Sequence, residues 1–206
     1  MSATHSGTAR VEFWFEFAST YSYPAAMRVE AAARAAGVTL DWKPFLLGPI
    51  FQRQGYESSP FLAHADKGRY MWRDVERLCA KHGLAWRMPS AFPRTSVLAA
   101  RVACSHADAP WLPDFVRTIY AANFAEDRDI GAPEVVRDAL VGAGVADPDA
   151  ALAFAQRDDE KPKLRGNTEA AQTRGIFGAP SFVVGEELFW GNDRLEDALD
   201  WARRAR

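Results

Sequence analysis

The chain has 206 residues, 48% of them hydrophobic, and its 25 basic and 27 acidic side chains leave a formal net charge of −2. This composition predicts a folded domain with a sizeable core and excludes a disordered chain. No dense Lys/Arg block and no run near the ~18 apolar residues of a membrane span are found, and the first ten residues lack the apolar stretch of a signal peptide. We therefore expect a cytoplasmic protein with no nucleic-acid or membrane partner.

The cysteines and histidines stand singly along the chain. Cys79 and Cys104 lie 25 positions apart, each inside a helical pattern. The four histidines show no catalytic or metal-ligand spacing: His5, His64, His82 and His106. The sequence therefore predicts neither a disulfide framework nor a metal site.

The opening of the chain has the pattern of a βαβ unit. Residues 11–17 read VEFWFEF, in which apolar residues alternate with Glu12 and Glu16 apart from the central Trp14, and this alternation is typical of a strand. Residues 23–36 are rich in alanine and end at Gly37, which predicts a helix. Residues 38–42 form a second short β-type run, and a right-handed crossover makes the two strands parallel.

Helical patterns dominate from Pro44 to about Gly166. Apolar stripes predict helices over residues 66–82 and 112–120, and Pro133 opens a third helix over residues 134–140. The β texture returns at residues 181–184, and a turn and residues 188–190 complete a hairpin. Asn192 or Asp193 is a candidate N-cap of the final helix, whose apolar residues share one face.

A strand, a short loop, a helix and a strand, followed much later by a hairpin and a closing helix, is the order of elements in a thioredoxin fold interrupted by helices. The sequence therefore predicts an α/β, thioredoxin-like fold with a large all-helical insertion. Residues 11–45 and 167–206 would form a discontinuous thioredoxin-like domain, and residues 46–166 the helical insertion domain.

Four separated motifs make this resemblance specific. FASTYSY stands at residues 17–23, Lys67 to Tyr70 has the form KxxY, FGAP stands at residues 177–180, and WGNDR stands at residues 190–194. Over about residues 11–203, the chain resembles the 2-hydroxychromene-2-carboxylate isomerase family, which has the DsbA-like thioredoxin fold and is related to the kappa-class glutathione transferases. Disulfide oxidoreductases of this fold carry CxxC where this chain has serine at both ends, so the loop itself cannot exchange disulfides.

The resemblance implies glutathione as cofactor and Ser19 as the catalytic residue. A serine hydroxyl at the positive end of a helix dipole suits a thiolate supplied from outside, while the residues alone are equally consistent with an ordinary N-cap. A cis bond between Ala179 and Pro180 would expose the Ala179 backbone to pair with glutathione, where the alternative is a proline that merely opens a strand. Asn192 and Asp193 would bind the γ-glutamyl end instead of only capping a helix.

Other contacts are expected around this core. Lys67 would approach a carboxylate of glutathione by resemblance, where its local sequence is that of a solvated helix charge. Relatives also carry an upstream asparagine, but residues 55–60 read GYESSP and have none. Tyr21, Tyr23 and Arg73 are the candidate substrate-binding residues, through a hydroxyl, a flat ring or a positive charge.

The implied reaction opens 2-hydroxychromene-2-carboxylate, a small aromatic carboxylate, and gives trans-o-hydroxybenzylidenepyruvate. A glutathione thiolate held by Ser19 would add to the conjugated carbon, allow rotation and be eliminated. Two alternatives stay open: a kappa-like glutathione transferase that releases a conjugate, and a non-catalytic protein that binds glutathione or a peptide. The resemblance also leads us to expect a homodimer.

Overall fold

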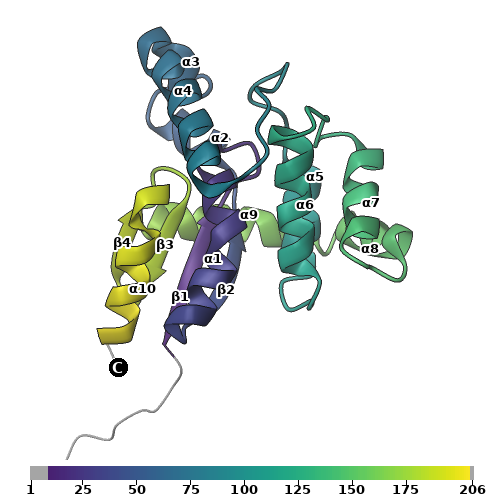
Figure 1. The fold of residues 1–206 in the computed structure, drawn as a ribbon. Helices are drawn as coiled ribbons and strands as arrows, with labels where there is room; N and C mark the ends of the chain where they lie inside the picture. The colour runs from purple at the N-terminus through teal and green to yellow at the C-terminus, as the bar shows by residue number, and fades with distance from the viewer. Residues whose placement is uncertain (1–8, 205–206) are drawn as a thin grey trace, which may run out of the picture.

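The computed structural model describes residues 9–204, so the polar leader and its His5 lie outside the described residues. A four-stranded sheet with the order β2-β1-β3-β4 forms the centre of the fold (Figure 1). β1 pairs in parallel with β2, as predicted, and antiparallel with β3, which pairs antiparallel with β4. The strands are β1 (Arg10–Phe15), β2 (Thr39–Pro44), β3 (Ser181–Val184) and β4 (Glu187–Trp190).

The helices follow the predicted arrangement, with more of them in the insertion than the sequence patterns identified. Residues 66–82, 112–120 and 134–140 all lie within observed helices. The helices are α1 (Ser22–Ala36), α2 (Leu47–Arg53), α3 (Pro60–Ala63), α4 (Ala65–His82), α5 (Val97–Ser105), α6 (Leu112–Phe124), α7 (Pro133–Gly142), α8 (Pro148–Ala155), α9 (Lys161–Thr173), the short 3₁₀ helix η1 (Asn192–Arg194) and α10 (Leu195–Arg204).

Both faces of β1 are covered, which explains why its alternating pattern is interrupted. Phe13 and Phe15 belong to the main core with α1 and α10, whereas Trp14 packs with Phe45 and Ala171 on the opposite face. An interior strand of this kind buries consecutive side chains. The prediction that the strand continues to residue 17 is wrong, because pairing with β2 ends at Phe15 and the chain turns there toward α1.

Figure 1 shows α3 and α4 at one end of the molecule, above the sheet, and α5 to α8 on the side away from β4. The division at residue 166 stays a prediction, and α9 runs continuously through that position toward β3. Within residues 9–204, no helix has the length and apolar character needed to cross a membrane.

Candidate functional site

Ser19 lies in the loop between β1 and α1, close to the first turn of the helix. Its hydroxyl donates to the carbonyl oxygen of Ala179 at 2.9 Å and accepts from the N–H of Ser22 at 3.3 Å. The N-cap position of α1 is Tyr21, which makes no side-chain cap bond. Ser19 is partly exposed, and its hydroxyl accepts a hydrogen bond from the first amide of α1 and also contacts the segment that precedes β3.

The Ala179–Pro180 peptide bond is cis. The Pro180 carbonyl accepts from the N–H of Gly191 at 2.9 Å, so this turn is tied to the end of β4. Ala179 is partly exposed, and its N–H donates no hydrogen bond within the part of the chain that the structure describes. An extended peptide could pair with that N–H in the manner of an added strand.

Buried polar groups support the Ser19 loop from below. The Glu16 carbonyl accepts from the N–H of Ser19 at 3.0 Å and from the Tyr120 hydroxyl at 2.9 Å. The Asn123 side-chain amide donates to the Phe17 carbonyl at 3.1 Å. Tyr120 and Asn123 come from α6, so a helix of the insertion holds the loop of the thioredoxin core. The sequence patterns gave none of the residues Glu16, Tyr120 and Asn123 a role at the site.

Tyr21 lies between the loop, α4 and η1. Its hydroxyl donates to Asp74 at 3.0 Å. Burial and this carboxylate raise the pKa of Tyr21 above its ordinary range, and the nearby charge of Asp193 adds to the shift. Tyr21 therefore stays a neutral phenol, and its position brings the predicted residues Ser19, Tyr21 and Asp193 into one neighbourhood.

Tyr23 does not face this site. The side chain is 1% exposed, its hydroxyl donates to the Ala85 carbonyl at 2.7 Å, and its ring packs against Tyr120 and Phe124. This placement contradicts the predicted substrate contact, because Tyr23 lies on the core side of α1 and has no surface left for a ligand.

Asn192 and Asp193 occupy η1 but differ in exposure. Asn192 is buried and its side-chain oxygen accepts from Arg28 at 3.0 Å, whereas the Asp193 side chain is 75% exposed. Neither forms the predicted cap: η1 follows Gly191 without a side-chain cap bond, and α10 continues from it directly. Within residues 9–204, Asp193 makes only a long, exposed ion pair with Arg194 at 3.7 Å, so its carboxylate stays accessible to a cationic group of a ligand, whereas the side-chain oxygen of Asn192 is occupied by Arg28.

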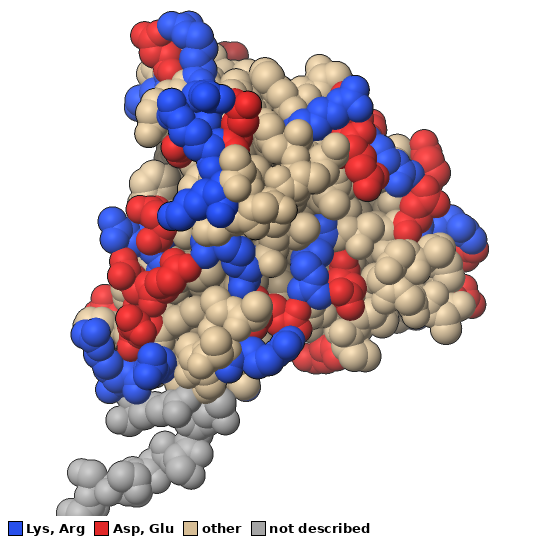
Figure 2. Space-filling view, viewed as in Figure 1, with Lys and Arg blue, Asp and Glu red and all other residues tan. Residues whose placement is uncertain are grey.

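The predicted basic residues of α4 lie on different sides of the helix. Met71 faces the loop and accepts a hydrogen bond from the Thr20 hydroxyl. Exposed Lys67 lies one turn earlier on the same face. Arg73 is about 160° around the helix from Met71 and pairs with Glu76 at 2.5 Å, so its position argues against the predicted substrate contact. Figure 2 shows Lys and Arg side chains along α4 at the upper left, mixed with acidic ones.

Two exposed aromatic rings border the cis-proline turn. Phe177 and Trp190, here called the aromatic pair, have ring centroids 4.8 Å apart and are 44% and 52% exposed. A Cβ at Gly178 would lie 2.4 Å from the indole nitrogen of Trp190, so glycine is needed for this close approach. The sequence patterns placed Trp190 in a motif and a strand but gave it no role at the site. Its place at the start of the WGNDR motif was the signal available in the sequence.

Known proteins resemble this chain in sequence and in fold. Residues 10–200 match the family described as DSBA-like thioredoxin domain. This chain belongs to that family. It is 26% identical over 189 residues to a 2-hydroxychromene-2-carboxylate isomerase of Sphingobium xenophagum, covering 92% of this chain and 95% of the relative.

A second relative is glutathione S-transferase kappa 2 of Caenorhabditis elegans, 24% identical over 204 residues that cover 93% of this chain and 90% of the relative. A solved structure of a 2-hydroxychromene-2-carboxylate isomerase has a TM-score of 0.80 to this chain at 24% identity, with 95% of each chain covered. The predicted family resemblance and the predicted thioredoxin-like fold with a helical insertion are both confirmed.

This DSBA-like protein has no thiol in its β1–α1 loop, where serines stand at residues 19 and 22. Cys79 and Cys104 are both buried. Burial raises the pKa of the Cys79 thiol to about 11 and that of the Cys104 thiol to about 12. Neither forms a reactive thiolate near neutral pH, so the site depends on hydroxyl and backbone groups.

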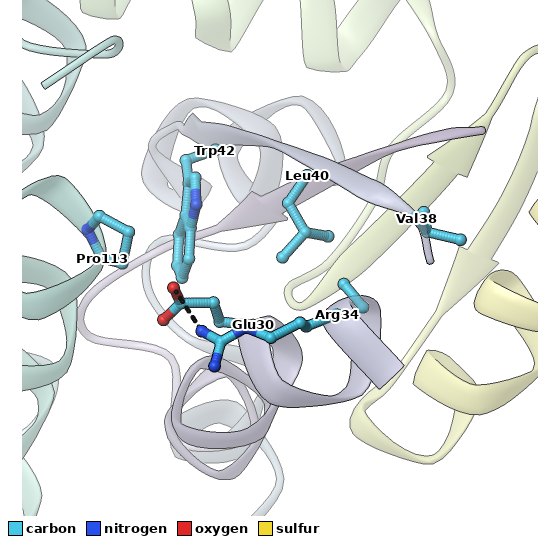
Figure 3. A pocket seen from close by; sticks show the side chains of 7 residues that line it. Glu30, Arg34, Val38, Leu40, Trp42 and Pro113 are labelled. Carbon is cyan, nitrogen blue, oxygen red and sulfur yellow. Dashed lines mark hydrogen bonds and ion pairs between the residues drawn. The ribbon is translucent and has the colours of Figure 1, made fainter. Parts of the chain in front are cut away.

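A surface hollow of about 230 Å³ lies elsewhere in the DSBA-like fold, between β2, α1 and the start of α6. Figure 3 shows Leu40 and Trp42 of β2 on one side of it and the ion pair of Glu30 with Arg34 on the other. Glu30 lies eight residues beyond Ser22, the first residue of α1, which is about 12 Å along the helix and away from the Ser19 loop. The hollow is therefore separate from the Ser19 site.

Proposed function

We propose that this protein is a glutathione-dependent isomerase that acts on 2-hydroxychromene-2-carboxylate or a related small aromatic carboxylate. The observation that carries the proposal is the Ser19 hydroxyl at the start of α1, 2.9 Å from the Ala179 carbonyl and beside cis-Pro180. This arrangement combines a hydrogen-bond donor, a helix N-terminus and an extended backbone at one place. The relatives named as isomerases support the same reaction class.

The residues around Ser19 fit glutathione, which is an anionic tripeptide with a thiol. The Ala179 N–H suits its peptide backbone, the exposed Asp193 carboxylate suits its γ-glutamyl ammonium group, and exposed Lys67 suits a carboxylate. The stretch where relatives carry an asparagine contains exposed Glu57 and Ser58 in this chain. We therefore propose glutathione as the cofactor, with weaker binding at that end.

The bound cofactor would supply a thiolate that adds transiently to the conjugated carbon of the substrate and leaves again after bond rotation. The protein contributes the hydrogen bond that stabilises this sulfur. The Ser19 hydroxyl donates to the Ala179 carbonyl, so a ligand N–H that takes over that carbonyl would free the hydroxyl to donate elsewhere. Binding of the peptide backbone and activation of Ser19 would thus be coupled.

The aromatic pair gives the substrate ring a place to bind. Both side chains are exposed. Phe177 lies two residues before Ala179, and Trp190 is the last residue of β4, where it pairs with Ser181 of β3. Planar rings gain about 0.5–1.5 kcal/mol from stacked or edge contacts with such side chains. We propose that the aromatic pair takes the role of ring contact that the sequence had suggested for Tyr23.

The test is the spectral conversion of 2-hydroxychromene-2-carboxylate by the native chain, Ser19→Ala and the control Thr173→Ala, with and without glutathione. Thr173 is exposed at the end of α9, so its change removes a hydroxyl away from the site. We expect glutathione-dependent turnover that Ser19→Ala lowers by roughly 100-fold or more, as for other donors that stabilise a reacting anion. Turnover that is absent, or equal without glutathione, would contradict the proposal.

A kappa-like glutathione transferase is the second candidate, favoured by the relatives of that name. Both reactions would use the Ser19 site, so product analysis separates them: an isomer with glutathione regenerated, or a stable conjugate. Binding of glutathione without turnover of either kind would identify a non-catalytic binding protein. A homodimer located in the cytoplasm is a further proposal from the resemblance, and the oligomeric state is measurable by analytical ultracentrifugation.

A further inference from the structure

Glu16 is a buried acid directly beneath the Ser19 loop. It follows the last residue of β1 and is 7% exposed, although the strand pattern placed it among the polar positions. One carboxylate oxygen accepts from the N–H of Ala18 at 3.0 Å, and the other accepts from the hydroxyl of Ser96, at the start of α5. Both partners therefore donate to the carboxylate, which is the arrangement that an ionised acid satisfies best.

The backbone of Glu16 binds the same loop. Its carbonyl accepts from the Ser19 N–H, and the Tyr120 hydroxyl donates to the same carbonyl. The side chain and main chain of one residue thus hold the amides of Ala18 and Ser19, the two residues that lead into the candidate catalytic hydroxyl. A shift of this short segment would displace the Ser19 hydroxyl from Ala179.

We propose that Glu16 is a positioning residue of the Ser19 loop, and that its ionised carboxylate holds the loop in the conformation required for activity. The effect on turnover rests on the proposed function, whereas the effect on the loop rests on the hydrogen bonds alone. Protonation would replace a charge-assisted bond to the Ala18 N–H by a neutral one of roughly half the strength.

The surroundings place this change near neutral pH. Burial raises the pKa of Glu16 to about 7, against the opposing effect of the hydrogen bonds from Ser96 and Ala18. The titratable group that faces it from α6 is Tyr120, whose pKa is raised well above its ordinary range by burial and by the charge of Glu16. Tyr120 therefore remains a proton donor across this range. Asn123 of α6 and Ser96 are neutral, and the Arg94 guanidinium beyond them pairs with Asp127.

The experiment follows the backbone amides of Ala18 and Ser19 by NMR from about pH 5 to about pH 9, in the full chain and two variants. In the native chain, we expect both amides to titrate together with one midpoint near neutral pH. Glu16→Gln keeps the size of the side chain but cannot ionise, so this titration should disappear. Ser96→Ala removes a donor that favours the ionised form, so the midpoint should move up by about one pH unit.

Turnover with glutathione is measured over the same range. We expect native activity to fall several-fold below the amide midpoint, with the fall shifted in Ser96→Ala and missing in Glu16→Gln. A purely structural role would change the rate or stability without moving a pH midpoint. Amides that titrate unchanged in Glu16→Gln, or a midpoint that Ser96→Ala leaves in place, would overturn the inference.

The two proposals can fail separately. Amides that titrate as expected in a protein without glutathione-dependent turnover would contradict the proposed function and leave the loop inference standing. Turnover that depends on glutathione and on Ser19, with a pH profile unchanged in Glu16→Gln, would support the proposed function and contradict the inference about Glu16.

Discussion

The Ser19 loop and helix α4 border the same site, but they are held in opposite ways. The loop is anchored by buried donors from α6 and by Glu16, whereas the Lys and Arg side chains of α4 are exposed, and the ion pairs of Arg69 and Arg73 stay within that helix. Leaving a buried polar group unpaired costs about 1–3 kcal/mol, and an exposed ion pair contributes about 0–1 kcal/mol. We therefore expect the loop to fix the geometry of the site and the charges of α4 to contribute less to the binding of a ligand.

Asn123→Ala should have the largest effect on stability, because it removes buried hydrogen bonds that hold the Ser19 loop. The change removes the donor to the Phe17 carbonyl and an acceptor of the nearly buried Arg94. We expect the free energy of unfolding to fall by about 3 kcal/mol and turnover to fall with it. Denaturant unfolding measures the loss, with the exposed Gln156→Ala as the control. A loss below about 1 kcal/mol would show that the loop does not depend on the Asn123 donor.

Glu16→Gln should change how stability depends on pH. Because the folded pKa of about 7 lies above the ordinary 4.5, the native state binds this proton more tightly than the unfolded state. The contribution to wild-type stability is complete below about pH 4.5 and is lost as the pH rises through about 7, a loss of up to about 3 kcal/mol.

Glutamine does not ionise, so the stability of Glu16→Gln relative to the native chain should rise by that amount between about pH 4 and about pH 8. Unfolding curves at several pH values measure the difference. Glu186→Gln, in the exposed β3–β4 turn, is the matched control. Parallel curves for the native chain and Glu16→Gln would mean that Glu16 keeps one charge state throughout.

The same comparison explains which parts were predictable from the sequence. The strands and the long helices have periodic patterns, and the fold followed from their order. Glu16 was misjudged because a period-two pattern assigns it to a polar face, and only tertiary packing shows that the strand ends before it and that α6 covers it. Tyr23 was misjudged for a related reason, since closeness to Ser19 in sequence does not say which side of α1 faces the core.

The distant contacts were predictable only through motifs. Ala179 meets Ser19 across 160 positions, a contact that no local pattern indicates, and the resemblance supplied it. Trp190 was part of a quoted motif, but its packing over Gly178 depends on the register of the β3–β4 hairpin. Side-chain direction on α4 could have been predicted in part, because Lys67 and Met71 are four residues apart while Arg73 falls on another face.

Trp190→Leu tests the exposed part of the site with an intermediate effect. Loss of the ring from the aromatic pair should raise the KM for the aromatic substrate by roughly 3- to 10-fold, the equivalent of one aromatic contact, with little change in glutathione affinity. Steady-state kinetics with each ligand varied in turn measures this. Trp201→Leu is the control, since Trp201 is comparably exposed but belongs to α10, where its ring packs on Phe189 of β4. Equal effects of both changes would remove the aromatic pair from the site.

Lys67→Ala should have the smallest effect of these changes, and it tests directly whether an exposed charge of α4 contributes to glutathione binding. Lys67 shares a helix face with Met71, which contacts Thr20 of the loop, so its charge can act on a bound carboxylate. As an exposed interaction it should be worth less than about 1 kcal/mol, which is up to a fivefold rise in the Kd for glutathione. Added salt should reduce the difference between the native chain and Lys67→Ala.

Arg73→Ala is the matched control, because it removes a charge from the same helix on a face that points away from the loop and pairs with Glu76. Calorimetric titration with glutathione at two salt concentrations should separate the two variants. If Arg73→Ala weakened binding as much as Lys67→Ala, the long-range field of α4 would be the cause, and the position of each charge on the helix would not matter. A loss confined to Lys67→Ala would locate the carboxylate of glutathione beside the first turn of α4.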